Sequence, residues 1–488
     1  MRWSHGSVAE RFSGRDNSLG IIRFVLASAV VVSHASVLGF GDKEFGHYFS
    51  HGQTDLGKLA VYGFFVLSGI LVTRSGKRLP VGRFLWHRAL RLLPGLWVCL
   101  AVTAFVVAPF LYWRQQGGLE GFWGHSRGPL DYLWSNWAVA PRQNDVSGVI
   151  ATSRDSGLAH SPSIDAALWS LRYEVLCYFG VAILAITGVL TRARRAVLLL
   201  VVVLGWLILQ DAVHAPFWAG SDDSSYSVSF VLVEVMGKFD PDVILYLSFA
   251  FAVGSLIELY RERVPVSDVL GVTSAVVLMV TIHYGYLFIF GLLAFAYLLL
   301  WLAIRLPAPF RRIASRNDYS YGIYIYGFVV QQALVALGGA RWGFWPFLLM
   351  SLIGSTAVAA FSWHLVERPA MKLKDLGLRR PEPAVVPASV ADSGTTKPTA
   401  AAGSATTAGA GTPADARRPG AHQEPGRSQE PGRSQEPGRS QESGRSQEPA
   451  RSWEPGPARA ASGRPAKSAQ SAADGPEREF TESRFTAG

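Results

Sequence analysis

The sequence predicts an all-α, polytopic membrane protein: a bundle of about ten transmembrane helices with both termini in the cytoplasm and a disordered C-terminal tail. Of its 488 residues, 49% are hydrophobic and only 17% are charged, whereas a soluble protein carries about 25% charged residues. This shortage of charge excludes an ordinary soluble multidomain protein. The formal net charge is +10, but Lys and Arg lie in short blocks between apolar runs, so no nucleic-acid partner is expected.

Ten apolar segments account for the composition. The hydrocarbon core of a bilayer is about 30 Å thick, and a helix that crosses it needs roughly 20 residues. Segments of about this length predict a multi-pass protein of the cell membrane, with the lipid bilayer as one partner. The fifth is short, and the seventh and eighth meet at His283, so that pair forms either two spans or one long kinked pair. The predicted spans are residues 19–40, 57–73, 92–112, 168–190, 196–213, 242–259, 268–282, 284–304, 319–337 and 344–366.

The distribution of Lys and Arg predicts the orientation of these spans. If the N-terminus is cytoplasmic, the four inner loops hold 15 Lys and Arg in 46 residues, and the four outer loops hold 7 in about 105. Cytoplasmic loops of membrane proteins are enriched in basic residues. Both termini are therefore expected in the cytoplasm. The inner loops are residues 74–91, 191–195, 260–268 and 305–318.

The composition changes after the last span, which predicts a two-part organisation. Residues 1–375 form the membrane domain, and residues 376–488 are rich in Pro, Gly, Ala, Ser and charge. The motif QEPGRS and its close variants repeat through residues 423–452. Such a segment cannot bury enough apolar surface to offset its ordering entropy. We expect a disordered cytoplasmic tail, with an array of partner-binding repeats as the alternative.

Three ionisable residues inside predicted spans are the candidates for chemistry. A charged group at the centre of a membrane helix costs a few kcal/mol on insertion scales, so such residues tend to be paired or functional. Arg23 and His34 are eleven residues apart, which places them on one helix face about 16 Å from each other. Glu174 is about six residues into a span that enters from outside, which puts it roughly 9 Å below the outer boundary, at the depth of His34.

An imidazole and a carboxylate at equal depth suit a general base and its orienting partner. The structural alternative is an interhelical hydrogen bond for His34 and an ion pair for Glu174, and the residues alone leave both interpretations open. The two cysteines, Cys99 and Cys177, lie inside apolar runs and are expected to behave as small hydrophobic residues. No metal site and no permanently bound cofactor are predicted.

Five short motifs resemble those of a known family. Their order and spacing are similar to those of the acyltransferase-3 family of ten-span integral membrane O-acyltransferases, over about residues 15–375. The motifs are an R-x10-H element from Arg23 to His34, FFVLSGILVT from Phe64 to Thr73, RALRLLP from Arg88 to Pro94, WSLRYE from Trp169 to Glu174, and WHLVERP from Trp363 to Pro369.

This resemblance implies transfer of an acyl group, usually acetyl, from cytoplasmic acyl-CoA to a hydroxyl of an extracytoplasmic or membrane-associated acceptor, commonly a sugar. The acceptor would be a glycan or a glycoside. The catalytic His and the motif Arg of the family fall on His34 and Arg23, and its acidic position falls on Glu174. In such an enzyme His34 would remove the proton of the acceptor hydroxyl, oriented by Glu174, while Arg23 positions the donor.

The sequence also departs from the family pattern. Many members read GVDxFF where this chain has Val61 to Phe65, VYGFF, so a role of that Asp is absent or moved. The ninth span often carries a His after its Tyr-rich run, where this chain continues Tyr324 to Gly327, YIYG. Some members carry an extracytoplasmic esterase-like domain, and the repetitive tail is too polar to form one.

The basic residues at 74–91 are the candidate contacts for CoA. Arg83, Arg88 and Arg91 lie in a stretch with no acidic residue, and Arg88 and Arg91 are three residues apart at the mouth of the third span. Guanidinium groups bind phosphate with bidentate geometry. Membrane topology and contact with lipid phosphates explain the same residues equally well.

Two other classes of protein share these features. A membrane transporter of a polar or acylated small molecule would also have many spans and charges within them, although no matched pair of broken helices is apparent in two halves of the sequence. A non-catalytic membrane scaffold for the tail is the third possibility. Function that survives replacement of His34 would favour these over an enzyme.

Overall fold

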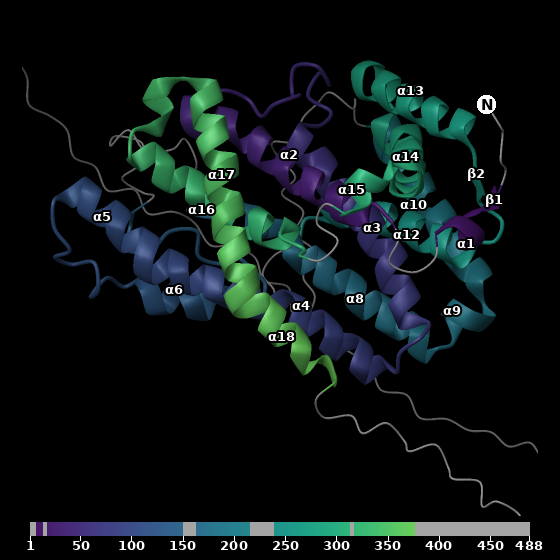
Figure 1. Cartoon of the computed structure of the whole chain (residues 1–488), viewed down its shortest axis with the longest axis horizontal. Coiled ribbons are helices and arrows are strands. Elements are labelled where there is room, and N and C mark those ends of the chain that lie inside the picture. The colour runs from purple at the N-terminus through teal and green to yellow at the C-terminus, as the bar shows by residue number, and fades with distance from the viewer. Residues whose placement is uncertain (1–5, 13–16, 150–162, 215–238, 313–316, 376–488) are drawn as a thin grey trace, which may run out of the picture. The chain divides into compact units, whose positions relative to one another are not determined.

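The computed structural model describes residues 6–12, 17–149, 163–214, 239–312 and 317–375 (Figure 1). The chain divides into two compact units, residues 1–388 and 389–488, and every described residue belongs to the first. Within the described residues the only strands are β1 (Gly6–Ser7) and β2 (Pro265–Val266), which pair antiparallel with Gly6 opposite Val266. The fold is mostly helical, as predicted. The tail, with its repeats, lies outside the described residues.

Helices occupy all ten segments that the sequence predicts as spans (Figure 1). Several are interrupted by short π or 3-10 turns. Their bounds are α1 (Val8–Arg11), α2 (Leu19–Phe40), α3 (Leu56–Gly76), α4 (Val81–Val102), η1 (Thr103–Val107), α5 (Ala108–Gln116), α6 (Pro129–Asn136), η2 (Ala166–Ser170), α8 (Leu171–Ile186), α9 (Val189–Arg192), α10 (Arg194–His214), α12 (Pro241–Leu259), α13 (Asp268–Tyr284), η3 (Leu287–Gly291), α14 (Leu292–Arg305), α15 (Ala308–Arg312), α16 (Ser320–Ala336), η4 (Gly339–Trp342), α17 (Phe344–Ser362), η5 (Trp363–Glu367), α18 (Arg368–Lys372) and η6 (Leu373–Asp375).

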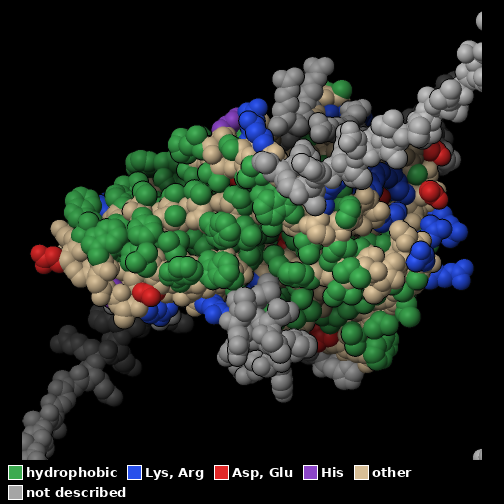
Figure 2. Space-filling view, turned by 90° about the horizontal axis from the view of Figure 1, so that it is seen from below, with side chains coloured by type: hydrophobic (Ala, Val, Ile, Leu, Met, Phe, Trp, Pro, Cys, Tyr) green, Lys and Arg blue, Asp and Glu red, His purple; other side chains and the backbone are tan. Residues whose placement is uncertain are grey.

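Seven helical stretches in the described part of the chain are long and apolar enough to cross a membrane, and α13 is a shorter apolar helix. Hydrophobic side chains cover much of the face in Figure 2, with Lys and Arg gathered toward one end. On α10, Leu199, Val202 and Trp206 are exposed, as expected for side chains that face lipid. The protein is therefore a membrane protein with several spans, while the number ten and the cytoplasmic termini stay predictions.

The third span begins earlier than the sequence predicts. Helix α4 starts at Val81, α3 ends at Gly76, and the chain stays helical from Val81 to Gln116. The predicted inner loop 74–91 is thus mostly helix. Its basic residues lower the hydropathy of this stretch, but the apolar residues between them keep a helical spacing and are partly buried. The side chains of Arg83, Arg88 and Arg91 therefore project from one helix, and the helix geometry sets their directions.

Two glycines bring α3 against α12. A Cβ added at Gly69 would lie 2.1 Å from the carbonyl oxygen of Phe251, and one added at Gly254 would lie 2.1 Å from that of Val66. Only glycine permits such close backbone contact, a device common between membrane helices. The hydroxyl of Thr73 donates to that of Ser255 across the same contact, at 2.9 Å. Helix α3 is therefore held firmly at the centre of the bundle.

Residues 163–170 pass into the bundle before α8 begins. The side-chain amide of Gln332 donates to the carbonyl of Ser163 at 2.9 Å, and the hydroxyl of Tyr324 donates to the carbonyl of Ala167 at 2.7 Å. Gln332 and Tyr324 are eight residues apart on α16, which corresponds to about 12 Å along the helix. Irregular and 3-10 backbone at this depth is tolerated because polar side chains satisfy it. Helix α8 therefore starts well inside the bundle.

Candidate functional site

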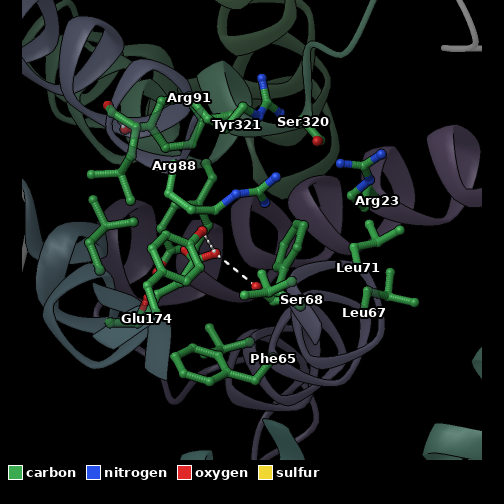
Figure 3. A pocket seen from close by; sticks show the side chains of 18 residues that line it. Arg23, Phe65, Leu67, Ser68, Leu71, Arg88, Arg91, Glu174, Ser320 and Tyr321 are labelled. Atoms are coloured by element: carbon green, nitrogen blue, oxygen red, sulfur yellow. Dashed lines mark hydrogen bonds between the residues drawn. The ribbon is translucent and has the colours of Figure 1, made fainter. Parts of the chain in front are cut away.

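A pocket opens among α2, α3, α4, α8 and α16 (Figure 3). Its volume is about 810 Å³, its open mouth included. Four of the predicted site residues line it: Arg23, Arg88, Arg91 and Glu174. Residues of four of the five sequence motifs thus meet in one cavity, because the helices that carry them pack around α3. His34 and Arg83 do not line this pocket.

Asp318 links two of the arginines. Its Oδ2 is 2.9 Å from Nη1 of Arg23 and 2.7 Å from Nη2 of Arg91. Burial raises the pKa of the Asp318 carboxyl, but the charges of Arg23 and Arg91 outweigh it and lower the pKa to about 2. Nη1 of Arg91 is also 3.8 Å from Oε2 of Glu367. Sequence reasoning missed Asp318, which lies between two spans among basic residues. The four charges form a buried network that fixes the pocket wall.

Arg88 differs from its neighbours because no ion pair joins it to a carboxylate within the described residues. Its guanidinium carbon is 5.9 Å from the ring centroid of Tyr178, and its Nε is buried without a hydrogen-bond partner. The Nε of Arg23 is likewise unpartnered. Figure 3 shows the Arg88 side chain extending into the cavity. A partly buried cation without a counter-charge is suited to bind an anion.

Glu174 accepts two hydrogen bonds in the pocket. The hydroxyl of Ser68 donates to its Oε1 at 3.1 Å, and that of Tyr178 donates to the same oxygen at 2.5 Å (Figure 3). Tyr178 is four residues after Glu174, so the two lie on one face of α8, and this spacing is visible in the sequence. Glu174 therefore fixes Tyr178, whose ring packs against Arg88.

His34 lies at another level of the bundle. Its ring packs edge-to-face on Phe328, with centroids 5.2 Å apart. The preceding residue, Ser33, donates its hydroxyl to Oδ1 of Asp55 at 3.1 Å. No hydrogen bond or ion pair between His34 and Glu174 occurs in the described part of the chain. The structure therefore brings Glu174 together with Arg23 and Arg88, and it leaves His34 beside the beginning of α3.

The predicted equal depth of His34 and Glu174 is wrong. Helices α2 and α3 run antiparallel, since a Cβ added at Gly57 would lie 3.1 Å from Ser33 and one added at Gly63 would lie 3.0 Å from Leu26. Ser68, the partner of Glu174, is eleven residues beyond Gly57, or about 16 Å further along α3. The prediction placed the start of the fourth span at the membrane boundary. In the structure, residues 163–170 enter the bundle before α8 begins, so Glu174 lies deeper than predicted.

Arg83 is also separate from the pocket. It lies five residues before Arg88 on α4, which turns its side chain by about 140° around the helix, and it is absent from the pocket lining. The predicted contact of Arg83 with the same anion as Arg88 is therefore not supported. Among the described residues no group of three or more His, Cys, Asp and Glu side chains is placed to hold a metal ion.

Comparison with known proteins identifies relatives of this arrangement. Residues 16–364 match the family model described as an acyltransferase domain, Acyl_transf_3. The chain is 28% identical over 387 residues to nodulation protein 10 of Rhizobium leguminosarum bv. viciae, a match that covers 76% of this chain and 97% of the relative. It is 27% identical over 366 residues to the O-acetyl transferase of Shigella phage Sf6, covering 72% of this chain and 96% of the relative. No solved structure matches the chain.

Proposed function

Because the chain belongs to the acyltransferase-3 family of membrane O-acyltransferases, we propose that it transfers an acyl group, with acetyl as the expected one, from cytoplasmic acyl-CoA to a hydroxyl of a carbohydrate or glycosylated acceptor. The family and the relative named as an O-acetyl transferase support the transfer of an acyl group to oxygen. The donor, the acceptor and the location in the cell membrane are parts of the proposal.

The unpaired Arg88 carries the proposal for the donor. CoA bears phosphate groups, and an arginine without a carboxylate partner contributes its full charge and its N–H groups to such an anion. The unpartnered Nε atoms of Arg88 and Arg23 lie in the same pocket. Arg91 is already engaged by Asp318 and Glu367, so its role in this proposal is to support the wall. The pocket also lies toward the basic end of α3 and α4, which this proposal assigns to the cytoplasmic side.

His34 is the proposed general base. It lies about 16 Å outward from the level of Glu174 and Arg23, so the phosphates would bind in the pocket while the thioester arm extends along α2 and α3. His34 would take the proton of the acceptor hydroxyl as that oxygen attacks the thioester carbonyl. Collapse of the tetrahedral intermediate expels the CoA thiolate, which takes up the proton from the imidazolium. Acyl ester and free CoA result.

Mass spectrometry of cell-envelope and secreted glycosides from a strain that lacks the gene tests this proposal. We expect one glycoside species to lose an acyl mass and to regain it when the wild-type gene is restored. Arg88→Ala should fail to restore it, whereas Arg83→Ala, a matched change on the same helix outside the pocket, should succeed. An unchanged acyl profile in the deletion strain would contradict the proposal. A transporter would instead leave acyl-CoA unconsumed by the purified protein.

A further inference from the structure

Asp55 is a buried carboxylate at the beginning of α3. The residue is only 3% exposed. Its Oδ1 accepts from the backbone N–H of Lys58 at 2.8 Å, which caps the helix, and from the hydroxyl of Ser33 at 3.1 Å. Nζ of Lys58 is 3.4 Å from its Oδ2, but that lysine side chain is 60% exposed. An exposed partner is screened by solvent, so much of the negative charge of Asp55 acts inside the bundle.

The charge of Asp55 acts on His34. Ser33, which binds Asp55, is the residue before His34, and Gly57 allows α2 to approach α3 so closely that an added Cβ would lie 3.1 Å from Ser33. Among the described residues, Asp55, Glu44 and Lys58 are the charged groups near enough to act on the His34 ring, and a hydrogen bond to Ser33 ties Asp55 to α2. From α16 the ring meets the uncharged Phe328.

We propose that Asp55 is the positioning carboxylate of His34, in the role that the sequence predicts for Glu174; this inference rests on the proposed function. A general base becomes a cation as it accepts the proton, and a fixed carboxylate nearby stabilises that cation without rearrangement. Glu174 cannot serve His34 in this way, since it lies about 16 Å away along α3 and is engaged by Ser68 and Tyr178. Asp55 acts on the reaction through His34 and has no contact with the donor pocket.

Asp55→Asn isolates the charge. Asparagine keeps a side-chain oxygen for Ser33 and for the helix cap, and it is among the best capping residues. We expect kcat to fall about 10- to 100-fold, as when the carboxylate that supports a catalytic imidazole is lost. The KM for acetyl-CoA should stay within about twofold, because the pocket is untouched. The melting temperature in detergent should also be unchanged. If the Asn variant does not fold, Asp55→Ser keeps an uncharged helix cap. It should show the same fall in kcat with an unchanged KM for acetyl-CoA.

Lys58→Met is the matched control, because it removes the exposed charge beside Asp55 and leaves the carboxylate in place. Its kcat should equal that of the wild type within about twofold. Wild-type kcat in Asp55→Asn would overturn the inference, as would a loss of kcat that disappears when activity is expressed per folded molecule. His34→Ala separates the two levels of the argument. If His34→Ala is inactive while Asp55→Asn is fully active, only the role of Asp55 is refuted. If His34→Ala is fully active, the role of His34 as the general base is refuted as well.

Discussion

Arg88→Ala is expected to weaken the binding of acyl-CoA more than it affects any other property. Arg88 has no carboxylate partner among the described residues and a buried Nε without a hydrogen bond. Its replacement should therefore leave no buried acidic group unpaired. Hydrogen bonds to charged groups contribute about 1.5–3 kcal/mol each, so loss of one phosphate contact raises the KM for acyl-CoA about 10- to 150-fold. The KM for the acceptor should change by less than about threefold.

Arg91→Ala provides the contrast, because the same chemical change occurs three residues away in the same pocket. It removes one of the two arginine partners of Asp318, which keeps Arg23, and it takes from the buried Glu367 the arginine that lies 3.8 Å away. An uncompensated buried charge costs about 3 kcal/mol, so the main effect should be a lower melting temperature. The assay is initial-rate kinetics with purified protein in detergent, varying each substrate, with melting curves on the same preparations. An unchanged donor KM in Arg88→Ala would refute the reasoning and return Arg88 to a role in membrane topology.

Three further outcomes are expected. Glu174→Gln should raise the KM for acyl-CoA about fivefold through Tyr178 and Arg88, with a smaller loss of kcat than His34→Ala; a loss of kcat as deep as that of His34→Ala would restore the pairing predicted from sequence. Truncation after Arg380 keeps every described residue, so kcat in the purified protein should stay within about twofold, and inactivity of a well-inserted truncated protein would show that the repeats act in the reaction. The pKa of Asp318 is lowered to about 2 by Arg23 and Arg91 despite burial, so its contribution of about 2 kcal/mol is present above pH 4 and lost as the pH falls toward 2. The difference in melting temperature between wild type and Asp318→Asn should therefore shrink over that range, and a constant difference would contradict the assignment.

The positions of most helices follow from hydropathy alone. Helix α2 spans Leu19–Phe40 as predicted, because its apolar run ends at Gly41, whose left-handed backbone (φ 69°) stops the helix before a polar segment. The beginning of α4 was missed since its basic residues reduce hydropathy without breaking the helix. The fourth span begins within three residues of its predicted start, with η2 at Ala166 and α8 at Leu171, but residues 163–170 already lie inside the bundle. A sequence pattern does not show that depth.

The residue types of the site are predictable, but their partners are not. Arg23, Arg88, Arg91 and Glu174 were all identified from the sequence, and they meet in one pocket. The depth of Glu174 depends on how far the chain enters the bundle before its helix starts, so the sequence assigned it to the wrong neighbour. Asp318 and Asp55 lie just before helices, in polar surroundings where an acidic residue is unremarkable. Packing of the helices buries both residues: Asp318 becomes the partner of Arg23 and Arg91, and Asp55 becomes the partner of Ser33 on α2.

The most direct test of the account is the transfer of a labelled acetyl group from acetyl-CoA to a glycoside by the purified protein in lipid nanodiscs, compared between wild type and His34→Ala. The wild type is expected to form labelled ester and to release free CoA in equal amounts. His34→Ala should be slower by about 10²- to 10⁴-fold, the contribution of a general base, while it still binds CoA in the Arg88 pocket with unchanged affinity. Transfer at the wild-type rate by His34→Ala, or binding of acetyl-CoA without any transfer by the wild type, would contradict the account.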